Sequence, residues 1–321
     1  MRVLVLGAGG FIGRRLLAIL VRDGFDPIAG VHRSPARDAG VESRALDVLD
    51  AASVRDAMQD AQAVVNCTAG NAATIADGAR ILFETAASRP SKPMVVHLST
   101  MSVYGSARGT VTEQAPLLDD AGWYGAAKIE AEAHARTYAA GGGAVVVLRP
   151  GIVYGPGSAQ WSGRIATLLR ARRLGDLGAA GDGHCNLVHV DDVCAAIVAS
   201  LRTPAAQGRA YNLADPAAGS WNRYFVDYAR ALGAVPVQRL SGRRLKIEGK
   251  LIAPPLKILQ ILAAKAGLAG RVPEPIPPSL VRLFAQDLTL DASRAESDLG
   301  LRWTPLAEGL AQSAEWVRTA P

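Results

Sequence analysis

The first 150 residues alternate between short apolar runs and longer stretches with helical periodicity, and this alternation constrains the fold more than any other feature. The apolar runs are rich in β-branched residues, and we expect strands at 2–6, 28–32, 62–67, 94–99 and 144–149. The stretches between them predict helices at 11–23, 51–60, 72–88 and 123–140. Strands joined through helices of this length are parallel and linked by right-handed crossovers. The pattern therefore predicts an α/β fold with a doubly wound parallel sheet buried on both faces.

The alternation becomes irregular after Pro150, where proline and glycine interrupt the sequence repeatedly. The apolar runs at 187–190 and 210–213 still have the pattern of strands that return to the sheet. We therefore expect a smaller, discontinuous C-terminal lobe that binds the substrate. The expected division gives the sheet domain residues 1–160 and 184–215, and gives the lobe residues 161–183 and 216–321.

Composition narrows the class of protein and its compartment. With 321 residues and 49% apolar content, the chain can bury a large globular core. Its three cysteines lack any CxxC spacing, and His97 and His189 lie in apolar strands, so we expect no disulfide frame and no metal site. Met1 runs directly into the first strand, and no long apolar stretch occurs, so we expect neither an export signal nor a spanning helix. These features favour a cytoplasmic protein.

A glycine-rich loop lies between the first strand and the first helix, with the sequence Gly7-Ala8-Gly9-Gly10-Phe11-Ile12-Gly13. Glycines in this context permit a tight turn and let the backbone approach a pyrophosphate closely. The helix N-terminus then presents unpaired N–H groups to the anion. The loop therefore predicts a dinucleotide site in a Rossmann domain.

The end of the second strand indicates which dinucleotide is bound. An acidic residue normally stands there and binds the adenosine ribose, but this strand ends in His32 and Arg33. An arginine at this position can bind a 2′-phosphate with two hydrogen bonds, so we expect NADP(H) in preference to NAD(H). The alternative is that Arg33 is a solvated loop residue. Asp47, after the third strand, is expected to contact adenine in either case.

Tyr124 and Lys128 stand four residues apart at the start of a predicted helix, so both side chains share one face. A free phenol has a pKa of about 10, and a neighbouring ammonium together with the positive nicotinamide ring would lower it toward the range needed for proton exchange. We therefore expect Tyr124 to act as the acid or base at a carbonyl or alcohol oxygen. Lys128 would also hydrogen-bond the nicotinamide ribose.

Hydroxyl side chains follow the strand at 94–99, at the edge of the sheet where ligands bind in such folds. Thr100 is our candidate for orienting the substrate oxygen. Ser99 and Ser102 are alternatives, although capping of a turn is the simpler role for both.

Five motifs occur in the order and spacing of extended short-chain dehydrogenases, and on these the chain resembles that family, which includes NAD-dependent epimerases and dehydratases. They are Gly7-x-x-Gly10-Phe11-Ile12-Gly13, Thr100-x-x-Val103-Tyr104-Gly105, Tyr124-x-x-x-Lys128, Arg149-Pro150-Gly151-Ile152-Val153-Tyr154-Gly155-Pro156 and His189-Val190-Asp191-Asp192-Val193. The resemblance runs from residue 1 to about 215 and resumes at 290–300. Residues 216–288 carry no signature of the family.

Two departures from the family's patterns favour particular members. Sugar dehydratases carry an Asp-Glu pair after the threonine, where this chain has Met101-Ser102, so dehydration is not expected. Many nucleotide-sugar enzymes have an asparagine after the Arg-Pro strand, where this chain has Gly151-Ile152. The chain is therefore more similar to 3β-hydroxysteroid dehydrogenases and dihydroflavonol-type reductases.

Taken together, the motifs give a set of expected contacts. We expect the cofactor to be bound by Gly7, Gly10, Phe11, Ile12, His32, Arg33, Asp47, Val48, Cys67, Thr68, Ala69, Tyr124, Lys128, Pro150, Ile152 and Val153. Substrate contacts are expected at Met101, Ser102 and Tyr154.

Residues 236–272 are strongly basic, with eight arginines and lysines against one acid, Glu248. Within this stretch we expect a helix at 256–265 with Lys257, Gln260 and Lys265 on one side and leucine and isoleucine on the other. Such a helix can lie on an anionic membrane surface, which would make the protein peripheral to the inner face of the membrane. A lobe helix packed on the core, or a site for an anionic substrate, are the alternatives. Nucleic acid is not expected, because no aromatic stacking platform accompanies the charges.

The leading hypothesis is an NADP(H)-dependent oxidoreductase that interconverts a ketone and a secondary alcohol on an apolar substrate of lipid metabolism, such as a sterol, ketolipid or keto-ceramide-like molecule. A nucleotide-sugar epimerase or reductase of the same family is the alternative. A dinucleotide sensor without activity is disfavoured, because Thr100, Tyr124 and Lys128 are all present. The sequence leaves open whether the chain forms a homodimer.

Overall fold

The structure, a computed structural model, describes residues 1–32, 40–120, 122–265 and 274–319. The chain forms two compact units. The first comprises residues 1–153, 188–215 and 290–304, and the second comprises residues 154–187, 216–289 and 305–321. The expected division was wrong in placing 154–160 and 184–187 in the sheet domain and 290–304 in the lobe. The helix within 290–304 packs against the strand at 210–213 and the helix at 190–202, both of which belong to the first unit. Arg33, expected to bind the cofactor, and residues 266–272 of the basic segment lie outside the described residues.

The first unit is built on a seven-stranded sheet in the order β10-β7-β5-β4-β1-β2-β3. Its strands are β1 (Arg2–Leu6), β2 (Asp26–Val31), β3 (Glu42–Ala45), β4 (Ala63–Asn66), β5 (Met94–Leu98), β7 (Val145–Pro150) and β10 (Ala210–Leu213). All neighbouring strands pair in parallel, which confirms the predicted fold class. The chain moves outward from β1 to β3 and then from β4 to β10, so the order reverses between β1 and β4. Ligands bind at the carboxyl ends of the strands beside such a reversal.

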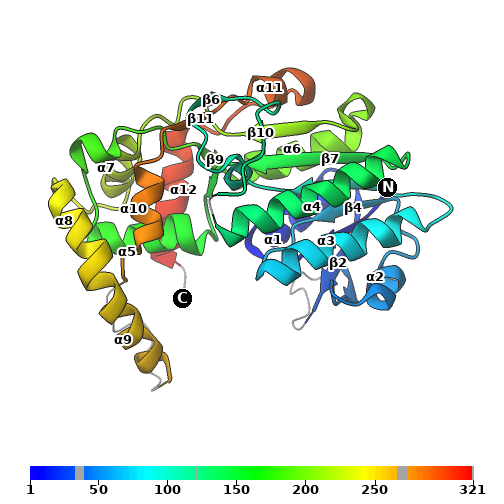
Figure 1. Cartoon of the computed structure of the whole chain (residues 1–321), viewed down its shortest axis with the longest axis horizontal. Coiled ribbons are helices and arrows are strands. Elements are labelled where there is room, and N and C mark those ends of the chain that lie inside the picture. Colours follow the sequence, from blue (N-terminus) through cyan, green and yellow to red (C-terminus); the bar gives the residue numbers. More distant parts are fainter. Residues whose placement is uncertain (33–39, 121, 266–273, 320–321) are drawn as a thin grey trace. The chain divides into compact units, whose positions relative to one another are not determined.

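Helices cover both faces of this sheet (Figure 1). They are α1 (Phe11–Arg22), α2 (Ala51–Ala57), α3 (Ala72–Ala87), α4 (Trp123–Ala140), α6 (Val190–Arg202) and α11 (Ser293–Leu299). Successive strand residues point to opposite faces, so Val3 and Val5 pack with α1 and α6, whereas Leu4 and Leu6 pack with α2 and α3. The interior strands of the sheet are therefore held by apolar contacts on two sides, which fixes where their carboxyl ends lie, whereas the edge strand β3 is largely exposed.

One expected strand does not join the central sheet. β9 (Leu187–His189) pairs instead with β8 (Ile152–Tyr154) in a separate two-stranded sheet, so the prediction for 187–190 was wrong in its pairing. β9 is short and runs directly into α6, so part of its apolar pattern belongs to the buried first turn of that helix. Another two-stranded sheet contains β6 (Gly109–Val111) and β11 (Leu288–Leu290).

The second unit is mainly helical. Its elements are the turns η2 (Ala159–Arg164), η3 (Gly178–Gly181) and η5 (Glu248–Ile252), and the helices α5 (Ile165–Arg170), α7 (Trp221–Ala231), α8 (Gly242–Ile247), α9 (Ala253–Lys265), α10 (Pro278–Phe284) and α12 (Leu306–Thr319). Its core is aromatic: the ring centroids of Trp221 and Phe284 lie 4.8 Å apart, and those of Phe225 and Phe284 lie 5.2 Å apart. Among the described residues, no helix has both the length and the apolar content that crossing a membrane requires.

Candidate active site

The glycine loop connects β1 to α1 in the way that the sequence predicts. Gly7 has a φ of +75°, and its carbonyl accepts a hydrogen bond of 2.9 Å from the Gly10 N–H. A Cβ atom on Gly13 would lie 2.3 Å from the Gly7 carbonyl oxygen, so only glycine lets the helix pack this closely on the loop. Helix α1 begins at Phe11 without a side-chain cap. Its first N–H groups are therefore available to an anion, as pyrophosphate binding requires.

The carboxyl end of β4 lies against this loop, at the reversal of strand order. A Cβ atom on Gly7 would lie 2.8 Å from the Cys67 carbonyl oxygen. Next along the chain, the Thr68 N–H donates to Asn66, and the hydroxyl of Thr68 is buried with no hydrogen-bond partner among the described residues. Such a hydroxyl normally has a partner, so it fits a ligand lying along Cys67, Thr68 and Ala69. These features match a bound dinucleotide.

The expected adenosine end of the site lies after β2 and β3. The imidazole Nε2 of His32 lies 3.7 Å from a carboxylate oxygen of Asp47. The other carboxylate oxygen of Asp47 accepts a hydrogen bond from the Leu49 N–H, and this contact fixes the turn that contains Val48. The structure thus brings His32, Asp47 and Val48 together.

The three residues expected to carry the chemistry also lie together, at the carboxyl end of β5. Thr100 begins the short helix η1 (Met101–Tyr104), while Tyr124 lies in the first turn of α4 and Lys128 lies one turn later. Tyr124 lies near Thr100, whose hydroxyl lowers the pKa of the phenol. The buried ammonium of Lys128 donates to the carbonyl of Leu98 at 2.7 Å, which holds it at the end of the strand. The site therefore presents a phenol and a second hydroxyl beside a buried cation.

Burial has the largest effect on the pKa values of Tyr124 and Lys128. The pKa of Tyr124 is raised because its hydroxyl is largely withdrawn from water, although the residue as a whole is 37% exposed, and Thr100 partly offsets this rise. Burial lowers the pKa of Lys128 to about 8, with the charges of Cys67 and Glu132 acting in the opposite direction. Because burial also raises the pKa of Cys67 to about 12, this thiol is neutral at pH 7, and Glu132 is the charge that matters. The expectation that Lys128 lowers the pKa of Tyr124 was wrong for the protein alone, where Thr100 has this effect.

Sequence reasoning missed a buried polar network behind the site. Arg149 binds Glu132 through two hydrogen bonds of 2.9 and 2.7 Å, and both side chains are buried. Arg149 also donates to the hydroxyl of Tyr104 at 2.9 Å, and this hydroxyl donates to Asn212 at 2.6 Å. The network joins α4, η1 and the strands β7 and β10. Since Glu132 follows Lys128 by one helical turn, the network fixes the helix that carries Tyr124 and Lys128.

An exposed aromatic residue at the site was also missed. Trp123 begins α4 and is 59% exposed, which is unusual for a side chain of its size. Its ring lies edge-on to that of Tyr124, with centroids 5.8 Å apart. A tryptophan immediately before a candidate catalytic tyrosine is the sequence signal that could have identified it.

The remaining expected residues are placed as follows. Met101 is buried and Ser102 is partly exposed, and the Thr100 hydroxyl donates to the Ser102 hydroxyl at 3.3 Å. Tyr154 belongs to the second unit and is buried, with its hydroxyl against Gly309 of α12. Three expected cofactor contacts end β7 or lie in β8, namely Pro150, Ile152 and Val153. His97 is a core residue whose Nδ1 lies 3.1 Å from the Asn66 amide, and burial lowers its pKa to about 3.

The family model for "NAD dependent epimerase/dehydratase family" matches residues 3–214, a span that contains both the glycine loop and the Thr100, Tyr124 and Lys128 group. The chain belongs to this family. It is accordingly an NAD-dependent enzyme of the oxidoreductase type, and the interpretation as an inactive sensor is set aside.

Curated relatives of this family member include reductases. The chain is 30% identical to a 3-diazoavenalumate denitrifying reductase from a Streptomyces species over 75% of this chain and 84% of that protein. It is 27% identical to the 2-alkyl-3-oxoalkanoate reductase of Stenotrophomonas maltophilia over 78% and 76% of the two chains. Identity to the ceramide reductase of Caulobacter vibrioides is also 27%, over 63% of this chain and 61% of that protein.

Solved structures similar to this family member include enzymes of nucleotide sugars. A UDP-glucose 4-epimerase of Thermotoga maritima matches with a TM-score of 0.77 and 18% identity over 99% of each chain, which shows the shared fold. MoeE5, solved with UDP-glucuronic acid and NAD, matches with a TM-score of 0.74 and 25% identity over the whole of both chains.

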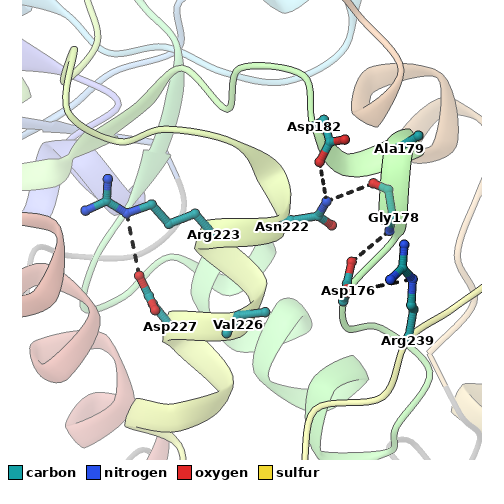
Figure 2. A pocket seen from close by; sticks show the side chains of 9 residues that line it. All are labelled: Asp176, Gly178, Ala179, Asp182, Asn222, Arg223, Val226, Asp227 and Arg239. Atoms are coloured by element: carbon teal, nitrogen blue, oxygen red, sulfur yellow. Dashed lines mark hydrogen bonds and ion pairs between the residues drawn. The ribbon is translucent and has the colours of Figure 1, made fainter.

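The second unit of this family member carries a separate polar cavity of about 430 Å³ (Figure 2). Charged side chains line it and pair with one another: Arg223 lies 3.6 Å from Asp227, and Arg239 lies 4.0 Å from Asp176. The amide of Asn222 donates to the Gly178 carbonyl at 2.8 Å. We assign no chemistry to this cavity, because both of its arginines are already paired with carboxylates of the same cavity.

Proposed function

We propose that the protein is an NADP(H)-dependent oxidoreductase that interconverts a ketone and a secondary alcohol on an apolar substrate. The observation that carries this proposal is the Tyr124 phenol, which lies near Thr100 and one helical turn from the buried ammonium of Lys128. The reductase relatives support it further, and among them the proteins named for ceramide and for 2-alkyl-3-oxoalkanoates support an apolar ketone of lipid metabolism.

In ketone reduction, the bound dinucleotide supplies the hydride to the carbonyl carbon. The phenol of Tyr124 donates its proton to the carbonyl oxygen as negative charge develops there. The hydroxyl of Thr100 donates a hydrogen bond to the same oxygen and so orients the carbonyl. In alcohol oxidation, the Tyr124 phenolate accepts the proton, and the nearby Thr100 hydroxyl stabilises that phenolate.

Lys128 supplies a positive charge near the reacting oxygen and near the expected position of the nicotinamide ribose. The ammonium stays buried because it donates to the Leu98 carbonyl and because Glu132 lies one turn away. Arg149 in turn compensates the charge of Glu132. The chain thus positions one cation at the site through a buried pair that does not itself touch the substrate.

The pKa of Lys128 predicts a pH dependence of cofactor binding. At a pKa of about 8, the lysine carries its charge below pH 8 and loses it as the pH rises above that value. We expect the dissociation constant for NADPH, measured by fluorescence titration, to rise by up to roughly tenfold between about pH 7 and about pH 9. Lys128→Met should bind more weakly at pH 7 with a flat profile in this window. An equally steep profile in that variant would contradict the assignment.

Trp123 supports the apolar character of the substrate, because its exposed ring adjoins Tyr124. We expect Trp123→Ala to raise KM for hydrophobic ketones by roughly tenfold, because the variant loses about 1.5 kcal/mol of the aromatic contact with the substrate. The value of kcat should change little. Trp123→Phe is the matched control and should retain most of the affinity. Steady-state kinetics with a long-chain and a short-chain ketone separate the cases: equal effects on both substrates would argue against a hydrophobic contact.

The preference for NADP(H) rests on the sequence, where His32-Arg33 replaces the usual acid after β2. Its test is the ratio of dissociation constants for NADPH and NADH. A ratio that favours NADPH in the wild type and approaches one in Arg33→Ala supports the proposal. Preference for NADH in the wild type would refute it without affecting the assignment of Tyr124.

A nucleotide-sugar epimerase is the second candidate, favoured by the whole-chain similarity to MoeE5. Two assays distinguish it from the ketone reductase. Consumption of NADPH with hydrophobic ketones supports the leading proposal. A melting shift of several degrees with UDP-glucose or UDP-glucuronic acid, together with epimerised product and no net consumption of the dinucleotide, would replace it.

A further inference from the structure

Exposed aliphatic side chains are concentrated in one short segment of the second unit. Of the 13 large hydrophobic residues that are exposed in the described chain, seven lie between residues 247 and 262. Leu251 is 70% exposed, Ile258 62% and Leu262 57%. Scattered exposed apolar residues are ordinary on a soluble protein, but a contiguous group marks a surface that binds something apolar.

These residues lie on a helical arm, defined here as residues 242–265, in which α8, η5 and α9 follow one another without a break. Figure 1 shows α8 and α9 as one extended arm. Leu251, Ile258 and Leu262 are spaced by seven and four residues, so they share one side of the helix. Ile252 and Leu259, also exposed and seven residues apart, widen this apolar side.

The arm is fixed at its base and exposed beyond it. Glu248 is buried and forms an ion pair with Arg173 of the same unit. Arg173 also donates to the carbonyl of Glu274 at 2.6 Å, and Ala253 is buried. The base of the arm is therefore anchored in the unit. The apolar side chains farther along α9 stay exposed although the arm itself is fixed.

The exposed charges of the arm have one sign. Arg243, Arg244, Lys250, Lys257 and Lys265 are exposed, and the one acid in residues 242–265, Glu248, is buried and paired. Lys250 and Lys257 are seven residues apart and flank the apolar side. Lys265 follows Ile258 by seven residues, so it lies on the apolar side of the helix and not on the side of Lys257. The expectation that Lys265 shares the polar side with Lys257 was therefore wrong.

We propose that the helical arm docks on the surface of an anionic phospholipid bilayer. The complementary surface must be apolar where it meets Leu251, Ile258 and Leu262, and acidic where it meets the flanking cations. A bilayer interface with anionic headgroups provides both, since aliphatic side chains enter the acyl boundary while lysines remain at headgroup level. The seven exposed large side chains on the arm are all aliphatic, which distinguishes it from surfaces that stack nucleic-acid bases.

A second copy of the chain fits this surface less well. In a two-fold interface each arm would meet the same arm of its partner, so the cations of one copy would face those of the other. An anionic bilayer instead gains about 1 kcal/mol for each lysine or arginine near its surface. Charge thus favours lipid over self-association.

The test is co-sedimentation of the full chain with vesicles of phosphatidylcholine alone and of phosphatidylcholine with phosphatidylserine. The wild type should pellet with the anionic vesicles at low salt, and less at high salt. Lys250→Ala/Lys257→Ala/Lys265→Ala should lower the partition coefficient by roughly 100-fold, at about fivefold per charge. Leu251→Gln/Ile258→Gln/Leu262→Gln should also abolish pelleting at low salt.

The matched control is Val21→Gln/Leu49→Gln, which removes exposed aliphatic residues from the first unit and should pellet as the wild type does. Failure of the wild type to pellet with anionic vesicles at low salt overturns the proposal. So does a wild-type dimer, detected by light scattering, that the aliphatic triple variant dissociates. Turnover of a water-soluble ketone without vesicles should be unchanged in both arm variants, so a failed docking test and a failed assignment of the reaction can be told apart.

Discussion

Replacing Tyr124 with phenylalanine should lower kcat for ketone reduction by about 10²- to 10⁴-fold, the range typical of losing a positioned proton donor. Phenylalanine keeps the ring and its edge-on contact with Trp123 but removes the hydroxyl and its proton. The dissociation constant for the dinucleotide should change little, because the glycine loop and Lys128 are untouched. The rate of single-turnover NADPH oxidation, followed by absorbance in the wild type and in Tyr124→Phe, measures the loss of activity.

Tyr138 provides the matched control, since it lies on the same helix and is remote from the site. Its buried hydroxyl donates to the Pro93 carbonyl at 2.6 Å. Tyr138→Phe should therefore lower the free energy of unfolding by about 1 kcal/mol and leave kcat unchanged. If Tyr124→Phe and Tyr138→Phe had the same activity, the role assigned to Tyr124 would be wrong.

The second large effect is expected at Arg149. Arg149→Met would leave the carboxylate of Glu132 buried without its bidentate partner, and would also remove a donor from the hydroxyl of Tyr104. Breaking one side of a buried ion pair costs about 3–5 kcal/mol. We expect the first unit to unfold roughly 10 °C lower in a thermal melt.

Two comparisons isolate the buried charge as the cause. Arg80→Met removes an ion pair with Glu84 of similar length, 2.9 Å, but on the exposed surface of α3, so its cost should stay below about 1 kcal/mol. The double variant Glu132→Leu/Arg149→Met should be more stable than Arg149→Met alone, because it removes the carboxylate that Arg149→Met leaves buried without its partner. A double variant as unstable as the sum of the two single ones would show that packing, and not charge, determines the loss.

Local sequence patterns determine most of the first unit. The strand and helix limits expected from apolar periodicity agree closely with those of β1, α1, α3, β5 and α4. This succeeds because a strand buried on both faces must be continuously apolar, and its crossover helix must be amphipathic. The pairing of β9 could not be predicted in the same way, because its few apolar residues continue into α6 and do not specify a partner strand.

The active site was likewise predictable from the sequence only in part. The spacing of Tyr124 and Lys128 on one helix predicts that they share a face, and the end of β5 predicts where Thr100 lies. The pairing of Glu132 with Arg149 depends on how α4 packs against β7, which neither residue's neighbours in the sequence indicate. The same holds for the rise in the pKa of Tyr124, which depends on burial and not on sequence spacing.

Transfer of deuterium tests the central claim most directly. NADPH deuterated at the transferable position of the nicotinamide ring would be incubated with the wild type and an apolar ketone, and the alcohol analysed by mass spectrometry. We predict one deuterium at the carbinol carbon, on one face only, and almost no labelled product with Tyr124→Phe. Folded wild type that binds NADPH yet transfers no deuterium to any apolar ketone, but epimerises a UDP-sugar, would contradict the proposed reaction.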